Sequence, residues 1–155
     1  MKQLKISTLF GWLVPTLTLA FFAAEFLVQN GEAIPAAGLE IIVTLPLLGL
    51  AVVFMAIPIF KYRKAMVDRK VVPRVNPFYA VRVVLLAKAV AISGAIFIGW
   101  HAGLAWAQFS SPVVTDAIWQ NLWAMFGGLV MVVCGLIVER NCRVPEDDKT
   151  DGAAA

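Results

Sequence analysis

The chain has 155 residues, of which 61% are hydrophobic and 15% are charged. Globular proteins contain about 45–50% apolar and about 25% charged residues, so this excess of apolar residues excludes a water-soluble domain of this size. The formal net charge is +3 at pH 7. The positions of the basic residues around the apolar runs explain this charge without a nucleic-acid partner.

Four apolar runs account for most of the chain, and each approaches or exceeds the roughly 20 residues that a membrane-spanning helix needs. None shows strict alternation, and backbone groups in lipid must be satisfied internally, so each run is predicted to be a helix. The expected fold is an all-α, integral membrane four-helix bundle over residues 1–143, followed by a disordered acidic tail, 144–155. The predicted spans are 6–28, 41–60, 79–108 and 117–138.

The first run has a basic start and an apolar centre, as a secretory signal does, with Thr18-Leu19-Ala20 as an acceptable cleavage site. The apolar residues continue through Phe26 and Leu27 to spanning length, which favours an uncleaved membrane helix. Cleavage stays open as an alternative, and it would leave three spans with unchanged orientation.

The second run carries no charge, and a loop rich in Lys and Arg follows it. Lys and Arg also precede the first run and follow the fourth, whereas loops 29–38 and 109–116 contain neither. Because cytoplasmic loops are enriched in Lys and Arg, we expect two helical hairpins with cytoplasmic N and C termini in the plasma (inner) membrane. Within the second run, Pro46 is a candidate kink, and Pro58 is close enough to the basic loop to end its helix.

The third run carries a stripe of small residues, one every four positions. Residues four apart share a helix face, and such stripes let helix backbones approach closely. We expect the stripe to pack against a small-residue set on the fourth run, with a homo-oligomer or partner interface as the alternative. The stripe consists of Ala87, Ala91, Ala95, Gly99 and Gly103, and the set on the fourth run of Ala124, Gly127, Gly128 and Gly135.

Lys88 also lies in the third run, about 13 Å along the helix axis from its inner boundary, where a bare ammonium is costly. Its stem can snorkel toward the cytoplasmic interface. We expect it to pair with Glu139, at the inner end of the fourth run, or with helix-end carbonyls; Glu139 is also the natural partner of Arg82. Binding of an anionic lipid or solute by Lys88 is the functional alternative.

The remaining polar residues predict no reactive centre. His101 lies near the outer end of the third run without a second His or Cys nearby, which favours a structural role. Cys134 and Cys142 are eight residues apart and suit neither a disulfide nor a metal site. We therefore expect no catalytic, cofactor-binding or metal-binding residues.

Two stretches, NPFYAVRVVLLAKAVAISGAIFIGWHAG (76–103) and GLIVERNCRVPEDD (135–148), resemble the actinobacterial membrane proteins grouped as "domain of unknown function 3180". The resemblance lies in a Pro before Ala-x-Arg, then Leu-Ala-Lys-Ala, spaced glycines, and a closing Glu-Arg-x-Cys-Arg-x-Pro. It covers the second half of the chain, while the first half agrees in hydropathy. It implies a small protein with four predicted spans and a cytoplasmic-side cluster of Arg82, Lys88, Glu139 and Arg143.

The expected function is that of a non-enzymatic membrane protein, an accessory or assembly subunit of a membrane or cell-envelope complex. Its expected partners are the bilayer and another membrane protein or a second copy of itself. Two alternatives stay open: a small oligomeric transporter or channel with Lys88 and His101 in its path, and an anionic-lipid-binding protein that uses Lys88. The lack of charge in the second and fourth runs argues against a solute pathway.

Overall fold

The computed structural model describes residues 4–68, 76–110 and 116–142. These ranges contain four α-helices and no strand, and all four helices are long and apolar enough to cross a membrane. The predicted all-α, four-helix membrane fold is therefore confirmed. The predicted acidic tail lies outside the described residues. The helices are α1 (Ile6–Gln29), α2 (Leu39–Val67), α3 (Pro77–Ser110) and α4 (Ala117–Asn141).

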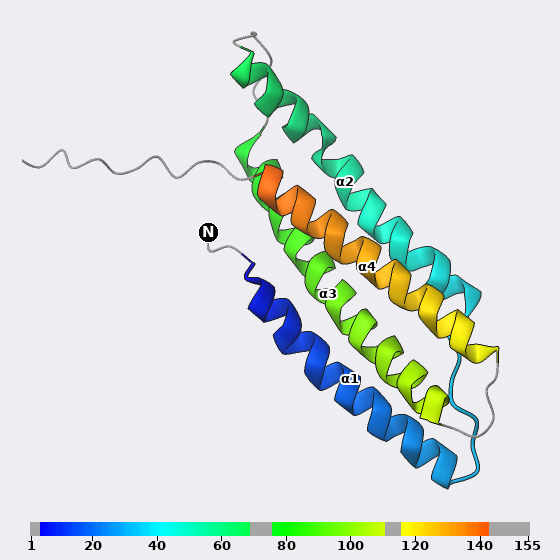
Figure 1. Ribbon diagram of the computed structural model, residues 1–155. Helices are drawn as coiled ribbons and strands as arrows, with labels where there is room; N and C mark the ends of the chain where they lie inside the picture. Colours follow the sequence, from blue (N-terminus) through cyan, green and yellow to red (C-terminus); the bar gives the residue numbers. More distant parts are fainter. Residues whose placement is uncertain (1–3, 69–75, 111–115, 143–155) are drawn as a thin grey trace, which may run out of the picture.

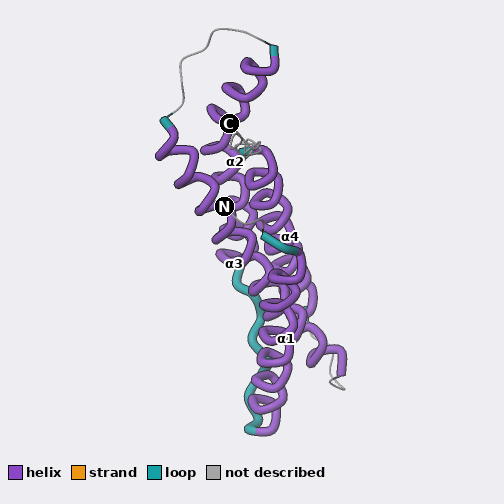
Figure 2. Tube along the Cα trace, turned by 90° about the vertical axis from the view of Figure 1, so that its left-hand side faces the viewer, coloured by secondary structure: helices purple, strands orange, loops and turns teal. Residues whose placement is uncertain are grey.

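The helices lie side by side in the order α1, α3, α4, α2 (Figure 1). Helices that are consecutive in the chain run in opposite directions, so α1 is parallel to α3, and α2 is parallel to α4. We call the end where α1 begins and α4 ends the inner end, and the opposite end the outer end. α3 and α4 form the centre, α1 packs against α3, and α2 packs mainly against α4. Among the described residues, α1 contacts neither α2 nor α4. Figure 2 shows this open layer edge-on, with α1 in front.

The connections follow from this order. Of the two expected helical hairpins, α3 and α4 form a packed one, whereas α1 and α2, although consecutive and antiparallel, lie at opposite edges of the layer and do not pack against each other. Residues 30–38 therefore have to cross from one edge to the other, past the outer ends of α3 and α4 (Figure 1). We call this segment the strap.

Local sequence sets several helix boundaries. Asn76 caps α3, because its Oδ1 accepts a hydrogen bond of 2.9 Å from the backbone N–H of Phe78, and Pro77 occupies the first helical position. α1 ends at Gln29, and Gly31, two residues later, has a φ of 77° that suits glycine. There, the backbone N–H of Glu32 bonds to the carbonyl of Leu27, which closes the last turn.

The expectation that Pro58 ends its helix is wrong, since α2 continues to Val67. An interior proline removes one backbone hydrogen bond, to the carbonyl four residues earlier. The residues beyond Pro58 include Lys61, Arg63 and Lys64, which are good helix formers and carry α2 past its apolar part.

The small-residue stripe of α3 faces two helices rather than α4 alone. Near the inner end it meets α4: a Cβ added at Gly135 would lie 2.6 Å from the carbonyl oxygen of Ala87. Near the outer end, Gly99 and Gly103 lie directly against the backbone of α1. An α-helix turns about 100° per residue, so each step of four residues rotates the stripe by about 40°. Between Ala87 and Gly103 it rotates by about 160°, from α4 to α1.

Candidate functional site

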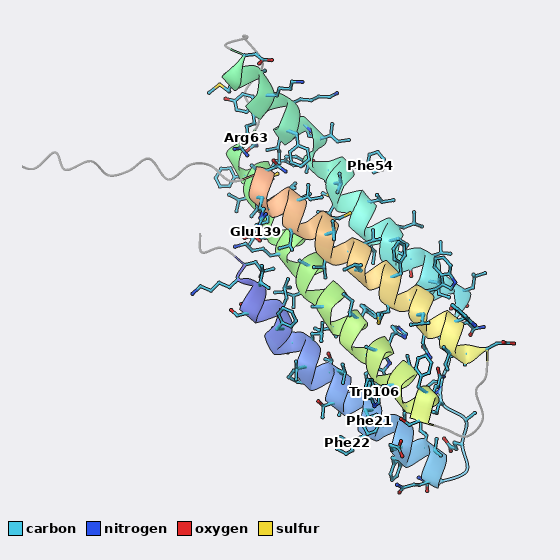
Figure 3. All side chains as sticks on the ribbon, viewed as in Figure 1. Phe21, Phe22, Phe54, Arg63, Trp106 and Glu139 are labelled. Carbon is cyan, nitrogen blue, oxygen red and sulfur yellow. The ribbon has the colours of Figure 1, made fainter. Side chains whose placement is uncertain are left out.

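A buried carboxylate joins three segments at the inner end of the bundle. Glu139, on α4, is only 4% exposed, and its Oε1 lies 3.5 Å from Nζ of Lys88 on α3. The same oxygen accepts a hydrogen bond of 2.8 Å from the backbone N–H of Leu4, just before α1 begins. Figure 3 shows Glu139 at the inner ends of α3 and α4. We call Lys88 and Glu139 the inner ion pair.

The inner ion pair explains how a lysine is held inside an apolar helix. The side chain of Lys88 is 20% exposed, so its stem lies mostly within the protein while its ammonium meets a carboxylate. An unpaired charge at this depth would be costly, and the pair offsets that cost. The arrangement links α4 to α3 and to the start of α1, which is a structural use of both charges.

The structure brings together two of the four residues expected in the cytoplasmic-side cluster. No ion pair joins Arg82 to Glu139 in the described ranges, and Arg82 is exposed near the start of α3. Because Arg82 and Lys88 are six residues apart, their side chains leave the helix about 120° apart. Arg143 lies outside the described residues.

A second group of polar side chains lies buried near the outer end. Nδ1 of His101 lies 3.0 Å from Oδ1 of Asn121, and Nδ2 of Asn121 donates to Oε1 of Gln108 and to the carbonyl oxygen of Pro35, both at 3.3 Å. The three side chains come from α3 and α4 and are all at least 97% buried. We call these three residues and the Pro35 carbonyl the outer polar cluster.

The hydrogen-bonding direction in the outer polar cluster is fixed by the Pro35 carbonyl. A carbonyl oxygen only accepts, so Asn121 must turn its amide nitrogen toward Pro35 and its oxygen toward His101. Nδ1 of His101 must then carry the proton and donate it. The His101 ring also stacks on Phe97, one helical turn earlier, with ring centroids 6.4 Å apart.

The outer polar cluster ties the strap to the central hairpin. The bond from Asn121 to Pro35 is the direct link between α4 and the middle of the strap. Apolar contacts support it, since Ala37 is buried in the core and Ile34 packs against a cluster from α1 and α3. Interhelical hydrogen bonds of this kind help to hold helices together in membranes.

A comparison with protein-family models matches residues 9–146 to the family described as "Protein of unknown function (DUF3180)". The chain belongs to this family. No curated protein and no solved structure matches the chain significantly. The family model covers both halves of the chain, whereas the motifs singled out above lie in the second half.

In this DUF3180 protein, the outer polar cluster contains two residues that sequence reasoning missed. Gln108 and Asn121 were not singled out, and His101 was considered by itself. A usable signal was present: His101 and Gln108 are seven residues apart and so share a face of α3, and Asn121 is an amide inside an apolar run. Asn and His side chains in membrane helices commonly hydrogen-bond across helices, so the three could have been grouped.

No group of three or more His, Cys, Asp or Glu side chains that could hold a metal ion occurs in the part of the DUF3180 chain that the structure describes. Cys134 and Cys142 are both buried and free. Beside Cys142, Nη1 of Arg63 donates a hydrogen bond of 2.8 Å to the carbonyl oxygen of Asn141 at the end of α4 (Figure 3). A cation at this position is favourable for a helix C-terminus.

The thiol of Cys142 should react slowly in the folded protein. Burial raises its pKa from 9.0 to about 11, although nearby Arg63 acts in the opposite direction. At a given pH below 9, the thiolate, which is the reactive form, is therefore about a hundredfold scarcer in the folded than in the unfolded chain. In a Cys134→Ser variant, iodoacetamide should alkylate Cys142 at least about a hundredfold more slowly before than after denaturation. Equal rates would show that Cys142 is not buried.

Proposed function

We propose that this DUF3180 protein is a non-enzymatic, multi-pass protein of the plasma membrane that serves as an accessory or assembly subunit of a membrane or cell-envelope complex. The open helix layer is the observation that carries this proposal. Because, among the four described helices, α1 packs against α3 alone, and α2 against α4 and α3, each edge of the layer leaves most of a long helix to lipid or to another protein.

The edges of the layer carry large side chains that point away from the bundle. Phe22 and Phe26 on α1 and Phe54 on α2 are each more than 60% exposed. Figure 3 shows Phe22 and Phe54 at the two opposite edges. Between α2 and α4 there is also an open apolar groove, walled by Pro46 on one side and by Trp123 and Phe126 on the other. These surfaces suit the apolar helices of a membrane partner.

Several polar groups inside the described spans are engaged in an ion pair or hydrogen bonds within the protein, which supports a structural role over catalysis or transport. Lys88 pairs with Glu139, and His101 with Asn121. The hydroxyl of Thr18 bonds to a carbonyl of its own helix, as does that of Thr44. A solute pathway needs polar groups that face a water-filled channel, and a reaction needs groups that face a substrate.

The charges at the two ends support a cytoplasmic location for the inner end. Exposed basic residues gather there, and the described acids outside the inner ion pair lie mainly toward the outer end. By the positive-inside rule, both chain termini are then cytoplasmic. The exposed basic residues at the inner end are Lys5, Lys61, Arg63, Lys64, Arg82 and Arg140.

Gentle extraction from the native membrane, followed by native mass spectrometry, tests the proposal. We expect a stoichiometric complex with another membrane protein. A photo-crosslinking residue at position 22 or at position 54, one on each edge, should yield a specific adduct in intact membranes. The same residue at position 106 serves as the comparison, because Trp106 is exposed on the central helix α3. A lone chain or homo-oligomer with no adduct at either edge would contradict the accessory-subunit role.

Anionic-lipid binding is the second candidate, and the gathering of basic residues at the inner end favours it. Each Lys or Arg near an anionic surface contributes about 1 kcal/mol to binding. Because the ammonium of Lys88 meets Glu139, the exposed basic residues are better placed than Lys88 to contact headgroups. An anionic phospholipid that persists in the mass spectrum and is lost in a Lys61→Gln/Lys64→Gln variant would favour this role.

A further inference from the structure

One buried amide nitrogen in the outer polar cluster has no hydrogen-bond partner among the residues that the structure describes. Nε2 of Gln108 is inaccessible to solvent and makes no hydrogen bond in the described part of the chain, although Oε1 of the same side chain accepts from Asn121. A buried, unsatisfied donor costs about 1–3 kcal/mol. Buried polar groups in native proteins nearly always have a partner, and where the protein supplies none, an ordered water or ligand is the usual explanation.

Turning the Gln108 amide around does not remove the mismatch. Asn121 is held with its nitrogen toward Gln108 by the Pro35 carbonyl, so a flipped Gln108 would set two N–H donors against each other. The oxygens of Asn121, Gln108 and Pro35 each accept one hydrogen bond within the cluster, the first from His101 and the other two from Asn121. Among the buried side-chain atoms that the structure describes, Nε2 of Gln108 is the donor that no protein acceptor reaches.

We propose that the outer polar cluster is a binding site for a neutral molecule that presents an acceptor oxygen to Nε2 of Gln108. Water is the smallest member of this class, and a hydroxyl or carbonyl oxygen of a small solute or lipid headgroup is the other source. The surroundings favour a neutral molecule over an anion, because Glu32 in the strap, Glu40 in the first turn of α2 and Asp116 just before α4 lie toward this end. An amide N–H₂ donor in turn disfavours a cation.

The site is independent of the proposed subunit role, since it lies under the strap and not on the edges of the layer. Three segments contribute to the site: α3 supplies Gln108 and His101, α4 supplies Asn121, and the strap supplies Pro35. A molecule bound there would bridge the central hairpin and the strap.

A structure of the full chain in a lipid nanodisc, at a resolution that shows ordered water, tests this proposal. We expect density within hydrogen-bonding distance of Nε2 of Gln108. Compact density would identify water, and elongated density would identify a solute or headgroup. A dry site in which the Gln108 amide has turned to a protein carbonyl would overturn the proposal.

A matched pair of variants tests whether the density depends on the Gln108 amide. Gln108→Met keeps the length of the side chain but removes both polar atoms, so the density should disappear. Gln120→Met changes an exposed glutamine on α4 and should leave the density unchanged. Density that persists in Gln108→Met would show that another group holds the molecule and would overturn the role of Gln108.

Discussion

Replacing Glu139 by Ala should lower the free energy of unfolding by about 3 kcal/mol, because it removes the buried carboxylate that the ammonium of Lys88 meets. The expected value lies at the low end for breaking a buried pair, since Lys88 is partly exposed and can snorkel further. The backbone N–H of Leu4 also loses its acceptor. Chemical unfolding in detergent micelles measures the change.

Two further variants separate the charge from the hydrogen bond. Glu139→Gln keeps an oxygen for Leu4 and should cost less than Glu139→Ala. A Lys88→Met/Glu139→Leu double variant should recover much of the loss, because apolar residues of similar size often replace a buried ion pair at little cost. Arg140→Ala removes an exposed neighbour of Glu139 and serves as the control. A double variant less stable than Glu139→Ala would contradict this account of the inner ion pair.

Gly99→Leu and Gly103→Leu should prevent α1 from packing against α3. A side chain at either position would run into the backbone of α1, near Leu13 or Leu17, and a backbone cannot step aside as a flexible side chain can. Overpacking a core usually costs about 1–3 kcal/mol, and we expect the upper end here because α3 is the one described helix that α1 packs against. The unfolding midpoint in detergent should fall accordingly.

Gly11→Ala is a matched control for these variants. It lies on α1, and an added Cβ would meet nothing within 4 Å. Alanine is the better helix former, so this change should leave stability equal or slightly higher. If Gly99→Leu were as stable as Gly11→Ala, the close contact between α1 and α3 would not exist in the membrane.

The spans and the inner ion pair could be predicted because each depends only on position along the sequence and on the resulting depth in the membrane. Hydropathy along the sequence locates the helices, and the depth of Lys88 in its span limits which acid can reach it. Glu139, at the inner end of the neighbouring span, satisfies that limit and is the residue found there.

The order of the helices could not be predicted in this way, because it depends on which face of an apolar helix meets which neighbour. Gly127 and Gly128 show the difficulty. They were grouped as one set, yet adjacent residues point about 100° apart. Gly127 meets Leu45 on α2, whereas Gly128 meets Gly94 on α3. The outer polar cluster was missed because His101 was considered by itself; its side-chain bonds join α3 to α4, and only the bond to Pro35 depends on the path of the strap.

The crossing of the strap has a consequence for how the chain assembles during synthesis. α1 and α2 leave the ribosome first, yet each packs against helices that are made later. We therefore expect α1 and α2 to enter the bilayer as separate segments surrounded by lipid before α3 and α4 are made. Insertion of these helices then comes before their association. A nascent chain stalled before α3 would hold two inserted helices and no tertiary structure between them.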